Sequence, residues 1–452
     1  MKSRAWLPFW VGLFAVPGVA AESRPSLSPA KLQRVAAVDE RYQSYDLETP
    51  IGAQGATPVD LSSPRLRKLA AALGPAYVRV SGTSEGWKGV VDFARAVDAK
   101  IVASFAVGAP DGAGASAPDQ PPKSFAHLKS IAGQIAAAEL FYQPAASGAP
   151  PGSDAAAFAR DVAAFRRSAR QAAPHMLVAG PGTAEGAPVA VATQTEALLS
   201  AEPKPLFDVF TYRYHGAISS KCARGNEEPV TSADQALSEE WLSRIDKVHA
   251  LQAALRDRFE PGKPIWVTET ADATCGGNAW ASSFLDTFRY VDQLARLAKR
   301  GVKVHMHDSL ASGESGLIDP KTLAPRPKYW AAVLWRRLMG GTVLDAGASR
   351  QGLHLYAHCL RGHRGGVAIL AINNTRNQPE SIELPIGTER YTLSARKLQQ
   401  SRVDFNGSEL RLQANDRLPD MRGIPVVKGT VVFVPASITF LAVANAGNAA
   451  CR

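Results

Sequence analysis

A carboxylate stands at the end of one short and strongly apolar segment. Residues 264–278 read PIWVTETADATCGGN, and the run of Ile265, Trp266 and Val267 lies just before Glu269. These β-branched and aromatic residues predict a buried strand that ends at Glu269. Carboxylates are rarely buried without a partner, and the carboxyl ends of barrel strands are where (β/α)8 enzymes carry catalytic groups. Glu269 is therefore a candidate catalytic residue. A polar residue that faces solvent is the alternative.

Strand-like and helix-like segments alternate along the chain before and after Glu269. Expected strands cover 41–48, 76–81, 101–107, 135–141, 176–180, 207–214, 265–269 and 302–307. Expected helices cover 64–73, 87–99, 125–131, 154–173, 190–200, 233–258, 279–299 and 328–339. Eight strands that alternate with helices predict an α/β fold of the (β/α)8 TIM barrel type over residues 38–340. A doubly wound open sheet is the alternative.

The pattern changes after residue 340. Short strand-like runs at 353–360, 366–373, 381–384, 391–393, 410–412 and 429–442 are separated by turn residues, without a convincing helix. They predict an appended C-terminal β-sandwich over residues 341–452. Residues 24–37 are a candidate for completing it. Stretches 109–123 and 143–153, rich in Gly, Ala, Pro and Ser, are expected to be loops at the barrel rim.

The first 21 residues have the pattern of a secretory signal peptide. Lys2 and Arg4 precede an apolar run, and small residues close the run near Ala20 and Ala21. The run is too short to span a bilayer, and we identify no other membrane-spanning candidate. We therefore expect export to the periplasm or the extracellular space. Without Lys2 and Arg4, the formal net charge falls from +10 to +8, a balance that suits an acidic partner.

The cysteine content fits an oxidising compartment. The chain has Cys222, Cys275, Cys359 and Cys451, and four cysteines allow three pairings that a sequence does not distinguish. Pairing inside each expected domain favours the disulfides Cys222–Cys275 and Cys359–Cys451.

Several of these segments together resemble a known enzyme family. The segments RYQSYDLE, AYVRVSGT, AAELFYQP, DVFTYRYHG, WVTETADATCGGN, VHMHDSLASGESGLID and PRPKYWAAVLWRRLMG are similar to those of glycoside hydrolase family 79, the heparanase and β-glucuronidase family. This resemblance implies a barrel with a β-sandwich, and retaining hydrolysis of glycans that contain uronic acids. It implies that Glu269 is the nucleophile, and that backbone N–H groups of Gly276 and Gly277 help to hold the substrate carboxylate. No cofactor is implied.

The chain departs from the family pattern around the expected pocket. The family has Asn-Glu-Pro after strand four, with Glu as the acid/base, whereas this chain has Tyr142, Gln143 and Pro144. A glutamine amide cannot give a proton to a leaving alkoxide. The further departures are Arg213 for His, His215 for Tyr, Asp46 for Asn and Ser315 for Tyr. We expect these residues, with Tyr142, Tyr214, His307 and Asp308, to line the substrate pocket.

No residue has a sequence signature for the missing acid. Glu139 lies four residues before Gln143, so along an extended strand it is about 13 Å deeper, which indicates a structural carboxylate. Glu85 and Glu314 are better placed at the rim. Arg213 is expected to pair with Glu269 or with a bound uronate, and a surface role is its alternative.

Other classes of site find little support. His305 and His307 alternate along a strand, which is the spacing of many zinc pairs, but no third ligand has a supporting position. We therefore expect barrel-interior or pocket residues and no metal. Asp308 lines the pocket or caps a loop. No phosphate-binding loop, dinucleotide fingerprint or basic-aromatic module for nucleic acid is present.

Two hypotheses remain for function. One is an exported glycosidase that attacks acidic polysaccharides or glucuronides through Glu269, with an unidentified replacement for the acid. The other is a non-catalytic protein that binds acidic glycans on the same scaffold. A transglycosylase is a third idea, and it also needs a proton acceptor. The sequence does not predict the oligomeric state.

Overall fold

Eight parallel strands close into a barrel in the computed structural model, which describes residues 25–47, 59–81, 86–107, 132–142, 154–183, 188–221 and 231–452. They are β2 (Gln43–Asp46), β3 (Ala76–Ser81), β4 (Ala99–Val107), β5 (Ile135–Tyr142), β6 (Leu177–Thr183), β7 (Val209–Ala217), β8 (Ile265–Ala273) and β9 (Val304–His307). β9 pairs with β2 and closes the circle. The expected (β/α)8 barrel is therefore confirmed, and the open sheet is excluded.

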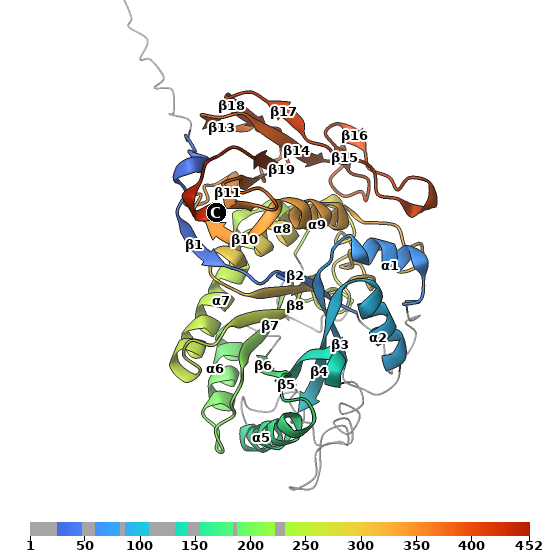
Figure 1. Ribbon diagram of the computed structural model, residues 1–452, viewed down its shortest axis with the longest axis vertical. Coiled ribbons are helices and arrows are strands. Elements are labelled where there is room, and N and C mark those ends of the chain that lie inside the picture. Colours follow the sequence, from blue (N-terminus) through green and yellow to red (C-terminus); the bar gives the residue numbers. More distant parts are fainter. Residues whose placement is uncertain are drawn as a thin grey trace, which may run out of the picture.

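Helices surround the barrel and cover its outer face (Figure 1). They are α1 (Pro64–Ala71), α2 (Trp87–Ala96), α5 (Ala155–Ala172), α6 (Pro188–Leu199), α7 (Glu239–Phe259), α8 (Phe284–Lys299) and α9 (Pro327–Leu338). The helix expected at 125–131, the rim loops at 109–123 and 143–153, and the signal peptide expected at 1–21 lie outside the described residues. Among the described residues, no helix has the length and apolarity that a membrane crossing requires.

Each barrel strand presents one set of side chains inward and the other set to the helices, because successive residues of a strand point to opposite faces. Tyr77, Val102, Trp266, Val304 and Met306 belong to one buried cluster inside the barrel. The intervening residues join the larger core between strands and helices. The apolar layer fills the barrel toward the N-terminal ends of the strands, so polar inward residues concentrate toward the C-terminal ends.

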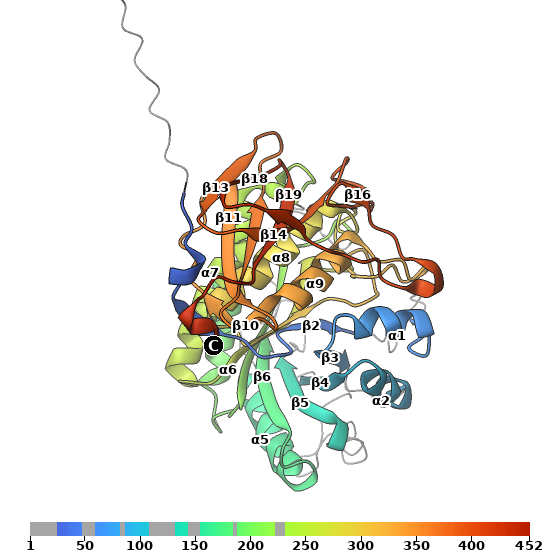
Figure 2. The same ribbon diagram turned by 45° about the horizontal axis from the view of Figure 1, so that its top comes forward.

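An antiparallel domain packs on the side of the barrel where α8 and α9 lie (Figure 2). Its large sheet has the order β1-β10-β11-β12-β19-β14-β15-β16, and β17 pairs with β14. A second sheet of β13 and β18 covers one face, with an apolar cluster between the two sheets. The bounds are β1 (Arg34–Ala37), β10 (Met339–Leu344), β11 (Leu353–Leu360), β12 (Val367–Asn373), β13 (Glu380–Leu384), β14 (Thr388–Ser394), β15 (Asp404–Phe405), β16 (Ser408–Glu409), β17 (Ile424–Val426), β18 (Gly429–Phe433) and β19 (Ser437–Val443).

Two details of this domain differ from the expected strands. Residues 410–412 are not a strand, and the nearby short strands are β15 and β16. The run at 429–442 is divided into β18 and β19 by a turn in which Ala436 has φ of 46°.

The segment before the barrel contributes β1, which pairs with β10. A disulfide joins Cys359 to Cys451, with the two Cα atoms 5.3 Å apart.

A buried polar network joins the antiparallel domain to the barrel helices. The imidazole of His354 on β11 lies 2.7 Å from the carboxylate of Asp292 on α8 and 2.8 Å from that of Glu239 on α7. The Tyr356 hydroxyl also donates to Asp292, at 2.7 Å. Burial lowers the pKa of His354, but the two carboxylates outweigh it and raise the pKa to about 9. A charged histidine therefore fastens the two parts of the chain together.

The network predicts a dependence of stability on alkaline pH. Because the folded pKa of about 9 exceeds the ordinary 6.5, protonated His354 stabilises the fold fully below pH 6.5 and loses this contribution as pH rises to 9. We expect up to about 3 kcal/mol of the free energy of unfolding to disappear across this window. Urea denaturation of the native protein and of His354→Gln at pH 6, 7.5 and 9 measures it. Parallel pH profiles of the two proteins would contradict the assignment.

Candidate active site

Glu269 reaches the inside of the barrel because β8 contains a β-bulge. Tyr212 and Arg213 are adjacent in β7, but they pair with Val267 and Glu269, which are separated by Thr268 in β8. The pairing of β8 with β9 also leaves one extra residue in β8. Two consecutive side chains, Thr268 and Glu269, therefore face the interior, which strict alternation would forbid. Thr268 donates to Glu139, while Glu269 extends toward Arg79. The bulge thus places Glu269 toward the C-terminal end of the barrel, with its side chain 15% exposed.

Arg79 on β3 holds three carboxylates together. Its guanidinium forms ion pairs with Asp46 on β2, with Glu139 on β5 at 2.9 Å and with Glu269 at 2.8 Å. The Ser104 hydroxyl accepts from Arg79 at 3.0 Å and donates to Glu139 at 2.9 Å. Buried charges persist where ion pairs and hydrogen bonds surround them, as they do here. Arg79 therefore fixes the position of Glu269 from inside the barrel.

A second guanidinium, that of Arg213, approaches the same oxygen of Glu269. Its Nη1 lies 3.3 Å from Glu269 Oε2, and its Nε donates to the Gly182 carbonyl at 3.1 Å. The guanidinium carbon also lies 4.4 Å from the ring centre of Phe141, a cation–π contact. Arg213 thus pairs with Glu269, one of the two partners expected from the sequence, and a surface role is excluded.

His215 and Asp308 lie beside the other oxygen of Glu269. His215 Nε2 is 3.4 Å from Glu269 Oε1 and 3.8 Å from Asp308 Oδ2. One side-chain ligand atom from each of the three residues lies within 4.8 Å of the others. Asp308 follows β9 directly, so the ends of β7, β8 and β9 together form this cluster. The structure thus places Asp308 and His215, both expected at the pocket, beside Glu269.

The surrounding charges keep Glu269 ionised. Burial works to raise the pKa of its carboxyl, but Arg79, Arg213 and His215 together lower it to about 2. Burial likewise opposes ionisation of Glu139, and Arg79 and Arg213 outweigh it and lower its pKa. Both carboxylates are therefore charged near neutral pH. A charged Glu269 has the protonation state that a nucleophile requires.

The loop after β8 packs closely against the loop after β9. Gly276 and Gly277 have φ of 78° and 91°, which favours glycine. A Cβ on Gly313 would lie 2.8 Å from Gly276, and the Gly276 carbonyl accepts from the amides of Glu314 at 2.7 Å and Ser315 at 3.3 Å. The Gly277 amide donates to the Thr274 carbonyl at 3.1 Å. The Gly277 amide therefore serves the turn in this structure, and the contacts of Gly276 and Gly277 with a substrate carboxylate stay predictions.

Three residues expected in the pocket point to the helices instead. The Tyr142 hydroxyl donates to Asp154 at the start of α5, and its ring contacts Phe158. Tyr214 belongs to the core between strands and helices. The His307 ring lies 5.0 Å from the Tyr290 ring on α8, and its Nε2 contacts the Ser315 carbonyl at 2.8 Å. Strand alternation explains these errors: the inward partners are Phe141, Arg213, His215 and Met306.

The other residues named from the sequence have different outcomes. Asp46 lies at the site, but its carboxylate is bound by Arg79, while buried Ser315 reaches the neighbouring loop through its backbone. Gln143, Glu85 and Cys222 lie outside the described residues. Cys275 is disulfide-bonded, and the Cys222–Cys275 pairing stays a prediction. Glu139 is a buried structural carboxylate, as its depth predicts.

Among the described residues, a histidine pair and one cluster of a histidine and two carboxylates are the candidates for metal ligands. His305 and His307 share a face, but it is the outer face, where His305 contacts Thr270 at 3.2 Å; the expectation of interior or pocket positions is wrong. His215, Glu269 and Asp308 have ligand atoms close enough to share an ion. Arg79 and Arg213 already contact Glu269, and two positive charges beside a ligand oppose binding of a cation. The cluster is better suited to proton transfer.

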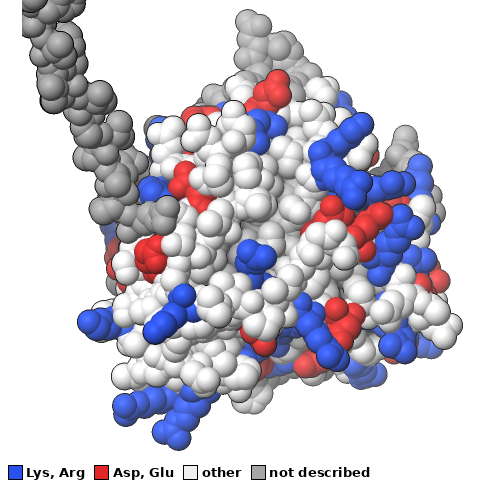
Figure 3. Space-filling model, turned by 90° about the horizontal axis from the view of Figure 1, so that it is seen from above, with Lys and Arg blue, Asp and Glu red and all other residues white. Residues whose placement is uncertain are grey.

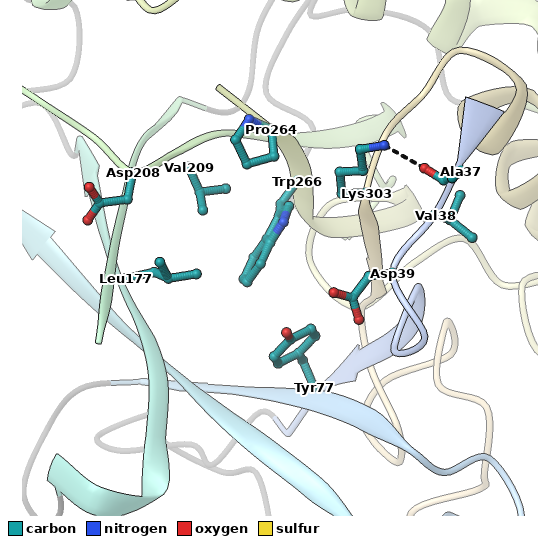
Figure 4. Close-up of a pocket in the computed structure, with 10 residues that line it drawn as sticks. All are labelled: Ala37, Val38, Asp39, Tyr77, Leu177, Asp208, Val209, Pro264, Trp266 and Lys303. Atoms are coloured by element: carbon teal, nitrogen blue, oxygen red, sulfur yellow. Dashed lines mark hydrogen bonds between the residues drawn. The ribbon is translucent and has the colours of Figure 1, made fainter. Parts of the chain in front are cut away.

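A cavity of about 360 Å³ opens at the opposite end of the barrel (Figure 4). The rings of Tyr77 and Trp266 face it, with Asp39 and Asp208 at its sides, and Lys303 turns away to donate to the Ala37 carbonyl. Trp266 precedes Glu269 by three residues on β8. This end of a barrel usually serves stability, so we do not place the reaction there.

Arg79 is the residue that the sequence analysis missed. Its strand, AYVRVS, was expected from the sequence, and alternation puts Tyr77 and Arg79 on one face. A guanidinium in the middle of a buried strand requires an acidic partner. That requirement was the signal, although it does not identify which carboxylates lie opposite.

Removal of Arg79 is expected to destabilise the fold strongly. In Arg79→Met, Glu139 and Asp46 lose their countercharge while they stay buried, which typically costs about 3–5 kcal/mol of the free energy of unfolding. Arg166→Met is the matched control, because its pair with Asp208 is partly exposed and is worth about 1 kcal/mol or less. Urea denaturation of both variants measures the difference. Equal losses would contradict the role of Arg79.

The chain is similar in sequence to several known proteins over part of its length. No protein-family model matches the chain. It is 29% identical to Heparanase-like protein 1 of Arabidopsis thaliana over 46% of this chain and 37% of that protein. It is 30% identical to Inactive heparanase-2 of Homo sapiens over 46% and 39% of the two chains, and 27% identical to Hyaluronoglucuronidase of Hirudo nipponia over 50% and 49%. The matches therefore span less than half the length of these relatives.

A solved structure supports the fold over nearly the whole chain. The 4-O-α-L-rhamnosyl-β-D-glucuronidase of Fusarium oxysporum superposes with a TM-score of 0.62 and 12% identity, covering 93% of this chain and 99% of that one. At this identity the likeness concerns the fold alone. The chain is thus similar in sequence to heparanases and heparanase-like proteins over part of their length, and it has the (β/α)8 fold found in glycoside hydrolases.

Proposed function

We propose that this protein is an exported retaining glycoside hydrolase that acts on glycans containing uronic acids, with Glu269 as its nucleophile. The observation that carries the proposal is the position of Glu269, which a β-bulge turns toward the inside of the barrel and two guanidinium groups keep ionised. Glu269 attacks the anomeric carbon and forms a glycosyl-enzyme ester, which water then hydrolyses. Asp46 and Arg79 lie behind Glu269 and hold it in place.

The proposed substrate class rests on charge and on the relatives. Arg213 lies at the inner wall, stacked on Phe141, and a guanidinium suits the carboxylate of a uronate. The relatives include proteins named heparanase and hyaluronoglucuronidase. On the face shown in Figure 3, Lys and Arg alternate with Asp and Glu around the edges. The surface charge of that face is therefore mixed, and we place recognition of the acid at the site itself.

Export remains part of the proposal. It is supported by the apolar segment after Lys2 and Arg4 in the sequence and by the disulfide between Cys359 and Cys451. Disulfides persist mainly in oxidising compartments. The segment 1–21 itself lies outside the described residues.

A second candidate function is binding of an acidic glycan without hydrolysis. It is favoured by Gln143, an amide at the position where the resembled family has its acid/base. Among the relatives is a protein named Inactive heparanase-2. A binding protein would also gain from Arg213, because its guanidinium lies at the inner wall and suits a carboxylate.

Trapping of the nucleophile separates these two functions. We expect a 2-deoxy-2-fluoro-β-glucuronide with a dinitrophenolate leaving group to add one fluoroglucuronyl group to the protein, because this leaving group departs without protonation. Intact mass spectrometry measures the adduct, and peptide mapping should locate it on Glu269. Glu269→Gln is the control and should stay unmodified.

Absence of the adduct would contradict the proposed hydrolase. Retained binding of uronic-acid oligosaccharides in that case would support the second candidate function. An adduct on another residue would contradict only the role of Glu269.

A further inference from the structure

We propose that Asp308, positioned by His215, supplies the acid/base that Gln143 cannot supply. The inference rests on the proposed function, because it takes Glu269 as the nucleophile. It replaces a carboxyl group expected at the end of β5 with one at the end of β9. The two neighbouring strands β8 and β9 would then carry both catalytic carboxyl groups.

The separation of the two carboxyl groups supports the assignment. One carboxylate oxygen of Asp308 lies within 4.8 Å of one oxygen of Glu269. Retaining glycosidases hold their two carboxyl groups about 5–5.5 Å apart, whereas inverting enzymes leave about 6.5–9.5 Å for a water molecule. The bound of 4.8 Å lies below the separation that inverting enzymes need, so it favours the retaining geometry.

The other carboxylates near Glu269 are held by a permanent positive charge. Glu139 is fully buried, accepts from Arg79, Ser104 and Thr268, and has a lowered pKa. Asp46 is bound to the same guanidinium. Neither can readily hold a proton for a leaving group. The ion-pair partner that the structure gives Asp308 is a histidine, at 3.8 Å. This contact is longer than the ion pairs that Arg79 makes with Asp46 and Glu139.

His215 is a positioning residue in this arrangement. Its Nε2 lies between the two carboxyl groups, 3.4 Å from Glu269 and 3.8 Å from Asp308. In this place it can orient both groups and separate their negative charges. The resembled family has a tyrosine here, and a tyrosine hydroxyl cannot carry the positive charge of an imidazolium.

The proposed steps conserve protons and electron pairs. Glu269 attacks the anomeric carbon, the bond from that carbon to the leaving oxygen breaks, and the Asp308 carboxyl gives its proton to that oxygen. The charge of Glu269 disappears in the ester, which favours ionised Asp308. Asp308 then accepts a proton from water as the water oxygen attacks the same carbon. The ester bond breaks and frees Glu269 as a carboxylate.

Substitution of Asp308 should impair hydrolysis according to the leaving group. In Asp308→Ala, we expect kcat/KM for phenyl β-glucuronide to fall about 10²- to 10⁴-fold, because phenolate needs protonation. For 2,4-dinitrophenyl β-glucuronide, we expect at most about a tenfold fall. Glu314→Ala is the matched control, because Glu314 is a partly exposed carboxylate in the same loop. It should leave the ratio of the two rates unchanged.

Rescue by azide is a second readout, and we would not expect it if Asp308 had only a structural role. In Asp308→Ala, a small anion can enter the space of the missing carboxylate and attack the glycosyl-enzyme. Added sodium azide should therefore accelerate turnover of the dinitrophenyl substrate and give a β-glucuronyl azide. If the alanine variant does not fold, Asp308→Asn, which preserves volume but cannot give a proton, still provides the comparison of the two leaving groups.

The possible outcomes separate this inference from the proposed function. If the native protein forms the Glu269 adduct but Asp308 variants lose both substrates equally and azide has no effect, only the role of Asp308 is overturned. If the native protein forms no adduct and hydrolyses neither substrate, the proposed function fails and this inference fails with it.

Discussion

The ion pairs of Arg79 are the constraint on which the site depends. One guanidinium contacts carboxylates from β2, β5 and β8 inside the barrel, so it fixes the separation of three strands as well as their charges. The carboxylates could not stay charged and buried without it. The bulge in β8 completes the arrangement, since it turns Thr268 to Glu139 and Glu269 to Arg79 at consecutive positions. The geometry of the candidate site and the stability of the barrel therefore rest on the same interactions.

The charges divide the carboxylates into two kinds. Glu139 and Asp46 are held by Arg79 and serve the structure, whereas Glu269 combines a pKa near 2 with partial exposure. Asp308 differs from all three because its ion-pair partner is a histidine. This division explains how a chain with Gln143 in place of a glutamate could still carry a nucleophile and an acid in one pocket.

The sequence predicts the barrel well because its signal is local: apolar strands and amphipathic helices alternate, and each can be recognised alone. It also names Glu269, Arg213, His215 and Asp308, which the structure brings together. It fails for Tyr142, Tyr214 and His307, because the same local pattern does not decide which face of a strand points inward. The bulge at Thr268 and the three partners of Arg79 depend on contacts between strands far apart in the chain, so no single segment reveals them.

The stereochemistry of hydrolysis tests the central claim most directly. A nucleophile at Glu269 with a second carboxyl group within 4.8 Å requires two displacements at the anomeric carbon, so a β-glucuronide must first release the β-anomer. Proton nuclear magnetic resonance during hydrolysis of 2,4-dinitrophenyl β-glucuronide measures the anomer before mutarotation. Initial release of the β-anomer is the result that the account predicts. Initial release of the α-anomer, or no hydrolysis, would contradict it.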